Sequence, residues 1–138
     1  MTSKKSPLAI LFVTLLIDMI GIGMVIPIIP IIFTDPTSPS FLLAAYSEKY
    51  WFIIAGLVTG LYGLVQFIAA PILGELSDLY GRKKLLTLGV GVLALSQFFL
   101  GFGIMIHSLA ILLVSRIIGG LAGANFSIAQ ATIADISK

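Results

Sequence analysis

Two ionisable side chains, Asp18 and Arg116, lie inside long apolar stretches of the sequence. An ionised group near the centre of a bilayer costs roughly 2.5–3.5 kcal/mol even on the most lenient scale, so such groups face a bundle interior or a water-filled cavity and have a partner. Asp18 and Arg116 are therefore the candidates for binding a proton or a solute. For Arg116 the alternative is structural: a buried pair, or a side chain that extends to the membrane surface.

The depths of these residues permit an interaction between them. Asp18 lies about ten residues into the first apolar stretch, roughly 15 Å at 1.5 Å per residue, and Arg116 lies about six residues into the last one, roughly 9 Å. In a hydrocarbon core about 30 Å thick these depths, measured from opposite surfaces, differ by about one helical turn. An ion pair, direct or through water, is feasible.

Asp18 has the chemistry of a proton carrier. Removal of a carboxylate from water favours its protonated form, whereas a neighbouring arginine favours the ionised form. Competition of substrate, proton and Arg116 for this one carboxylate would couple solute movement to proton movement.

A third candidate, Gln130, shares a helical face with Arg116. Small and polar residues recur there at three- and four-residue steps: Arg116, Gly120, Gly123, Ser127, Gln130 and Ala134. Such a face suits a cavity wall. The spacing of Gly119 and Gly123 is equally typical of close helix packing, and both interpretations can hold.

Composition indicates that lipid surrounds most of the chain. Of its 138 residues, 59% are hydrophobic and only 10% charged, whereas a soluble domain carries about 25% charged residues. The net charge of +2 comes from lysines and arginines beside apolar runs, which favours membrane topology over nucleic-acid binding. The chain has no cysteine and a single histidine, His107, so the sequence predicts no thiol chemistry, metal site or cofactor.

Four apolar stretches are long enough to span a bilayer, so the predicted fold is an all-α membrane bundle. The expected helices cover about residues 8–33, 51–73, 85–106 and 110–134. The first is expected to be a retained helix, because it is longer than the apolar core of a signal peptide and contains Asp18. The amides of Gln66 and Gln97, alone in apolar spans, are expected to form interhelical hydrogen bonds.

The charged stretch 74–84 is expected to be a cytoplasmic loop, because lysine and arginine in short loops stay on that side. This topology places six basic residues in the cytoplasm and only Lys49 outside. The six are Lys4, Lys5, Arg82, Lys83, Lys84 and Lys138. Both ends of the chain are then cytoplasmic, and His107 lies in a short external turn.

The stretch GELSDLYGRKK, residues 74–84, resembles the signature between the second and third helices of the major facilitator superfamily. The matching residues are Gly74, Leu76, Asp78, Gly81, Arg82 and Lys83. Ser77 and Leu79 depart from the pattern. The run from Arg116 to Ala124 is similar to the fourth-helix motif of that superfamily. The run from Asp18 to Pro30 is similar to the first helix of its drug–proton antiporter group, nearest to tetracycline-efflux proteins.

The resemblance implies a role for four residues of the charged stretch. Asp78 and Arg82 would act at a cytoplasmic gate, with Asp78 meeting a helix of the opposite half. Gly74 and Gly81 would permit the close turn. The same resemblance makes Asp18 a group for a proton or a cationic substrate, modulated by Arg116.

The resemblance also implies an incomplete transporter. The superfamily has about twelve spans in two halves, and this chain supplies four, so it is expected to be an N-terminal fragment that does not perform alternating access alone. The remainder of the transporter, the lipid bilayer and a small-molecule substrate are the expected partners. A proton gradient would supply energy, and the bacterial inner membrane is the expected location.

The function expected from the sequence is proton-coupled efflux of small amphipathic organic compounds. One alternative is a uniporter or symporter for sugars or other metabolites on the same fold. Another is a membrane module that assembles with a partner and transports nothing. An enzyme is not expected, because the sequence contains no nucleophile–base pair, phosphate-binding loop or metal-ligand cluster.

Overall fold

A computed structural model describes the backbone of residues 7–136 as a bundle of long helices, with no strand in that range. The elements in chain order are α1 (Pro7–Thr34), the short 3-10 helix η1 (Glu48–Tyr50), α2 (Trp51–Tyr80), α3 (Arg82–Met105), α4 (Leu109–Gly123) and α5 (Asn125–Ile136).

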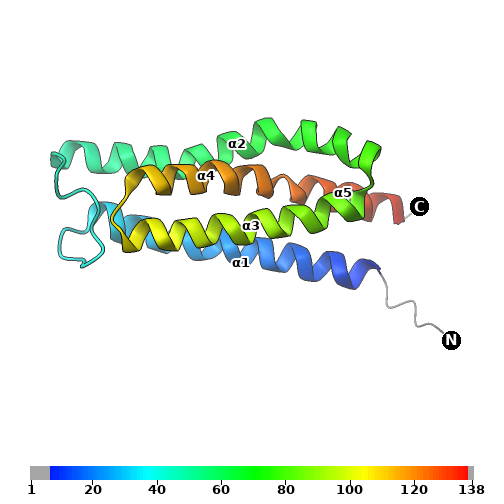
Figure 1. Cartoon of the computed structure of the whole chain (residues 1–138), viewed down its shortest axis with the longest axis horizontal. Coiled ribbons are helices and arrows are strands. Elements are labelled where there is room, and N and C mark those ends of the chain that lie inside the picture. Colours follow the sequence, from blue (N-terminus) through cyan, green and yellow to red (C-terminus); the bar gives the residue numbers. More distant parts are fainter. Residues whose placement is uncertain (1–6, 137–138) are drawn as a thin grey trace.

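The helices run back and forth between two ends of the bundle (Figure 1). α1 begins, α5 ends and the α2–α3 connection lies at one end. The loop 35–50 and the turn between α3 and α4 lie at the other. This alternation is the arrangement expected when each span crosses the membrane once.

Four stretches of the described chain are long and apolar enough to cross a bilayer: Leu15–Thr34, Glu48–Tyr80, Arg82–Met105 and Leu109–Gln130. The prediction of an all-α bundle with four transmembrane helices is confirmed. The cytoplasmic placement of either end stays a prediction.

The outer surface of the bundle is apolar. Large hydrophobic side chains are exposed along every long helix, among them Phe12, Phe67, Leu88, Met105 and Leu121. A soluble monomer rarely exposes such continuous apolar surface, whereas lipid tails accommodate it at no cost. The chain is therefore a multi-pass membrane protein.

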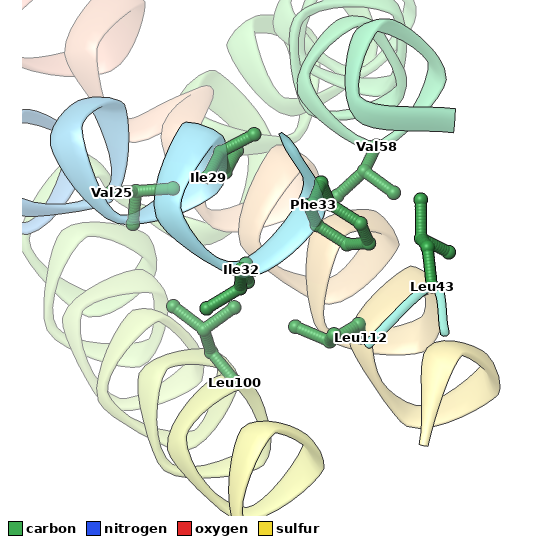
Figure 2. Close-up of a cluster of buried hydrophobic side chains, with 8 residues drawn as sticks. All are labelled: Val25, Ile29, Ile32, Phe33, Leu43, Val58, Leu100 and Leu112. Atoms are coloured by element: carbon green, nitrogen blue, oxygen red, sulfur yellow. The ribbon is translucent and has the colours of Figure 1, made fainter. Parts of the chain in front are cut away.

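A core cluster joins all four spans near the end that carries the loop 35–50 (Figure 2). It consists of Val25, Ile29, Ile32, Phe33, Leu43, Val58, Leu100 and Leu112. Phe33, Leu43 and Leu112 are completely buried. The cluster holds the C-terminal half of α1 against the other helices, and this half of α1 forms one wall of the cavity described below.

α4 packs most closely against α2 and α3. Its glycines leave no room for a side chain: a Cβ on Gly120 would lie 2.7 Å from the carbonyl oxygen of Tyr62, and one on Gly119 would lie 3.2 Å from the Tyr62 ring. Small residues let helix backbones approach closely in lipid. The prediction that the Gly119–Gly123 spacing serves helix packing is confirmed.

Two amides connect helices through backbone carbonyls. Gln97 Nε2 in α3 donates to the carbonyl of Gly21 in α1, and Gln66 Nε2 in α2 donates to the carbonyl of Gly123 in α4, both at 3.0 Å. Each bond satisfies an amide that would otherwise be desolvated without a partner. The predicted interhelical role of both glutamines is confirmed.

The predicted fourth helix, 110–134, is interrupted at Ala124, where α4 gives way to α5. The N–H of Ser127 donates to the Ala124 carbonyl, a three-residue step, while the Gly123 carbonyl accepts from Gln66. Asn125 turns its Nδ2 toward the Leu86 carbonyl of α3, at 3.4 Å. A side chain of α2 and a backbone carbonyl of α3 therefore form hydrogen bonds with this chain segment where its helical ladder changes.

The predicted loop 74–84 is wrong in its extent. α2 continues to Tyr80 and α3 begins at Arg82, so Gly81 alone connects them. Gly81 has φ of +92°, a backbone conformation that essentially only glycine adopts.

Candidate functional site

A cavity of about 600 Å³ lies among α1, α2, α3 and α4. Its walls are mostly apolar. The described lining residues are Gly21, Ile22, Val25, Ile26, Ile29, Pro30, Thr34, Phe52, Ala55, Gly56, Thr59, Gly60, Tyr62, Gln97 and Arg116. Arg116 is the only charged residue in this described lining.

Arg116 projects from α4 into the bundle and is only 6% exposed. Its Cζ lies 5.9 Å from the centroid of the Tyr62 ring, which places the guanidinium over an aromatic face. Such an arrangement is attractive because the ring face carries negative charge density. Nε of Arg116 is buried and forms no hydrogen bond within the part of the chain that the structure describes.

Three other polar residues of the lining form hydrogen bonds within the chain. Thr34 and Thr59 donate their hydroxyls to the carbonyls four residues earlier, at 2.7 and 2.8 Å. Gln97 donates its amide to Gly21. The guanidinium of Arg116 is thus the described lining group with most donor capacity left for a solute, since it carries five N–H donors and no acceptor.

Asp18 belongs to α1, but its side chain lies outside what the structure describes. Its position precedes two lining residues, Gly21 and Ile22, by three and four residues. Residues at these spacings share one face of a helix. An ion pair between Asp18 and Arg116 stays a prediction.

Gln130, the third predicted solute residue, lies on α5 with an exposed side chain. It is absent from the described lining of the Arg116 cavity. Ala124, where α4 gives way to α5, lies between Arg116 and Gln130 in the chain. Its part in solute binding stays a prediction.

The four predicted gate residues lie around the α2–α3 connection. Asp78 and Arg82 form an ion pair across Gly81, with Oδ1 and Nη2 3.1 Å apart. The Asp78 side chain is 66% exposed, so it is accessible to a further partner. Gly81 makes the turn, whereas Gly74 lies inside α2 and takes no part in it. The expected role of Gly74 in the close turn is wrong for this reason.

Comparison with known proteins agrees with this architecture. The family model of the Major Facilitator Superfamily matches residues 11–138. The chain belongs to this superfamily. No solved structure matches it significantly.

Several curated resistance proteins are similar to this superfamily member. It is 35% identical to the class H tetracycline resistance protein of Pasteurella multocida over 97% of the chain and 30% of that protein. It is 33% identical to the class C tetracycline resistance protein of Escherichia coli over 97% of the chain and 31% of that protein. It is 30% identical to the quinolone resistance protein NorA of Staphylococcus aureus over 93% of the chain and 29% of that protein. The chain therefore spans under a third of the length of these relatives.

Tyr62 lines the Arg116 cavity, but the sequence did not lead us to expect it as a site residue. It lies under Arg116 and against the glycines of α4. The sequence contained a pattern that could have indicated Tyr62: it stands four residues before Gln66 on α2 and therefore on the same helical face. A tyrosine in an apolar span also predicts a polar contact, since its hydroxyl requires a partner when it is removed from water.

Proposed function

We propose that this chain forms solute-binding helices of a proton-coupled exporter of small amphipathic organic compounds, and that the compound binds in the cavity beside Arg116. The observation that carries this proposal is the pairing of an apolar cavity with a single buried guanidinium. Such a site complements a compound that has an apolar body and an oxygen-bearing edge.

The size and chemistry of the cavity favour a compound of this kind. Its volume of about 600 Å³ falls within the range of about 300–1,000 Å³ that is usual for small-molecule pockets. Apolar side chains such as Val25, Ile26 and Phe52 would cover the body of the compound. Arg116 would donate hydrogen bonds to carboxylate, enolate or carbonyl oxygens, because a guanidinium only donates.

The names of the relatives support the same substrate class. They are resistance proteins toward tetracycline and quinolone, both of which are ring compounds with several oxygen acceptors. A compound of either class would place its rings against the apolar wall and its oxygens toward Arg116. A sugar, which is polar on every side, would leave most of its hydroxyls without partners here.

Asp18 is proposed as the proton carrier. Its position on α1 is within about one turn of the cavity residues Gly21 and Ile22. A compound bound beside ionised Asp18 would compete with a proton for this carboxylate, so binding of the compound would release the proton and protonation of Asp18 would displace the compound. This competition would couple export to proton entry.

The rest of the transport cycle requires a second surface. We propose that further helices of the transporter close the cavity on its open side, and that Asp78 and Arg82 contact them at a cytoplasmic gate. The N-terminus of the chain would then be cytoplasmic, in the inner membrane of a bacterium. The exposed Asp78 side chain beside the Gly81 turn supports a contact of this end of the bundle with further helices.

Reconstitution of the full-length protein into liposomes tests the coupling. Addition of a tetracycline or a quinolone should cause proton release that a pH-sensitive dye records. Asp18→Asn should abolish this release, while the matched control Asp35→Asn, in the loop outside the spans, should retain it. Release of protons by Asp18→Asn at the wild-type level would refute the assignment of the carrier.

A further inference from the structure

A second hollow, separate from the Arg116 cavity, lies between α2 and α3. It is a groove of about 420 Å³ whose floor comes from α4 and α5, the helices drawn between α2 and α3 in Figure 1. Its described lining is Val65, Ile68, Ala69, Ile72, Leu73, Leu85, Leu88, Gly89, Val92, Leu121, Ala122, Asn125 and Ile128. Asn125 is the one polar residue among these, and its amide donates to the Leu86 carbonyl.

The groove opens sideways from the bundle. Ile68, Ile72, Leu88 and Leu121 form part of its lining and are exposed, Leu88 at 66%. In a membrane, this surface meets the hydrocarbon tails of lipids. An apolar groove without charge is suited to a tail and offers nothing to the polar edge of a solute.

A basic depression adjoins the groove where α3 begins. Its lining consists of Gly81, Arg82, Lys83, Lys84, Thr87 and Leu88. Leu88 lines both hollows, so they adjoin at this side chain. Lys83 and Lys84 are exposed and form no ion pair with any residue that the structure describes, whereas Arg82 is paired with Asp78.

The distance along α3 from the basic depression to the groove fits the distance in a phospholipid from the phosphate to the upper part of an acyl chain. From Lys84 to Val92 the helix rises about 12 Å, at 1.5 Å per residue. A phosphate bound at Lys84 would therefore place the upper part of an acyl chain beside Leu88 and Val92. The side chains of Leu85, Leu88 and Val92 recur at helical spacing and form one continuous track for that chain.

We propose that this groove holds an anionic phospholipid, with its phosphate at Lys83 and Lys84 and one acyl chain between α2 and α3. The charge of the depression selects an anionic headgroup, and the uncharged groove accepts the tail. A basic residue near an anionic membrane surface strengthens binding about fivefold. The inference does not depend on which compound the protein transports.

Lipid retention tests the headgroup contact. The full-length protein is assembled in nanodiscs with equal amounts of phosphatidylglycerol and phosphatidylcholine, and the lipids that stay bound are counted by native mass spectrometry. Phosphatidylglycerol should be preferred, and Lys83→Gln with Lys84→Gln should lower the preference at least tenfold. The control Lys4→Gln with Lys5→Gln removes the same charge elsewhere. An equal loss in both double variants would overturn the proposal.

Fluorescence quenching tests the groove itself. The chain has no cysteine, so Leu121→Cys in the groove and Leu95→Cys outside it can each carry a single fluorophore. Phosphatidylglycerol with a nitroxide on its acyl chain should quench the label at position 121 more than nitroxide phosphatidylcholine does, and both lipids should quench position 95 equally. Equal quenching at position 121, or no quenching there because protein covers the groove, would overturn the proposal.

Discussion

The guanidinium of Arg116 lies over the ring of Tyr62, with Cζ 5.9 Å from the ring centroid. The same ring packs against Gly119 and Gly123 of α4, on the neighbouring turns of the helix that carries Arg116. One aromatic side chain thus fixes both the approach of α2 to α4 and the position of the charge in the cavity. The packing of α2 against α4 and the position of the buried guanidinium are therefore linked.

Replacement of Arg116 should weaken solute binding more than it weakens the fold. Arg116→Gln removes a charged donor, and a hydrogen bond to a charged group contributes about 1.5–3 kcal/mol. We expect the affinity for a tetracycline or quinolone to fall about tenfold to a hundredfold. Arg116→Lys should give an intermediate loss, because lysine keeps the charge but not the planar fork. Isothermal titration of the detergent-solubilised full-length protein measures the affinity of both variants for the compound.

The control for the two Arg116 variants is Lys49→Gln, which removes a cation from the loop outside the cavity. It should bind the compound like wild type. Wild-type affinity in a folded Arg116→Gln variant would show that Arg116 does not contact the solute.

A methyl group at Gly120 should separate α4 from α2. Its Cβ would lie 2.7 Å from the backbone carbonyl oxygen of Tyr62 and 2.8 Å from Cβ of Val65, so a backbone must move. We expect Gly120→Ala to destabilise the protein by about 1–3 kcal/mol, as overpacking does. Gly91→Ala is the matched control, because a Cβ at Gly91 meets nothing within 4 Å. Thermal unfolding in detergent can be followed by the fluorescence of Trp51. The midpoint temperature should fall for Gly120→Ala and not for Gly91→Ala. Equal midpoints for the two variants would argue against close packing of α4 on α2 at Gly120.

The two glycines of the charged stretch should respond in opposite ways. Gly81→Ala forces a side chain into φ of +92°, which costs about 1–3 kcal/mol. Gly74→Ala replaces a helical glycine beside open space, which should be neutral or stabilise by about 0.5–1 kcal/mol. Chemical denaturation of both variants in mild detergent compares them directly. Equal destabilisation would mean that Gly74 also has a conformational role.

Asp35, in the loop after α1, should stay ionised to lower pH than an ordinary aspartate. The hydroxyl and the N–H of Thr37 donate to its Oδ1, at 2.6 and 2.9 Å, and these bonds lower the pKa of Asp35 below the ordinary 3.8. The contribution of this turn to stability is therefore present above about pH 3.8 and is lost as the pH falls through the lowered value. Carboxyl NMR should report a rise of the Asp35 pKa in Thr37→Ala. An unchanged pKa would contradict the hydrogen-bonding explanation.

The sequence predicts the spans of this fold well, because apolar length is a strong signal in a membrane. Gln66 and Gln97 were also predictable, since a lone amide in lipid must find a partner. The break at Ala124 was not, because it depends on contacts that Gln66 and Leu86 supply from other helices. The helical ends around Gly81 were missed because charge and glycine suggest a loop even where the backbone continues to Tyr80.

The candidate site was predictable in part. A lone arginine in an apolar span points to a cavity, and the structure places Arg116 in one. Tyr62 was missed because its packing against the glycines of α4 depends on the tertiary arrangement, which leaves no periodic pattern in the sequence. Gln130 was grouped with Arg116 on one helical face, and the structure places it on α5, outside the described lining of the Arg116 cavity.

The central claim, that a compound occupies the cavity beside Arg116, is tested most directly by cysteine protection. Thr59→Cys lines the cavity, whereas Leu57→Cys is exposed on the same helix but outside the described lining. In the full-length protein, a saturating tetracycline or quinolone should slow alkylation at position 59 at least tenfold and leave position 57 unchanged. Equal alkylation rates at position 59 with and without a bound compound would contradict the claim.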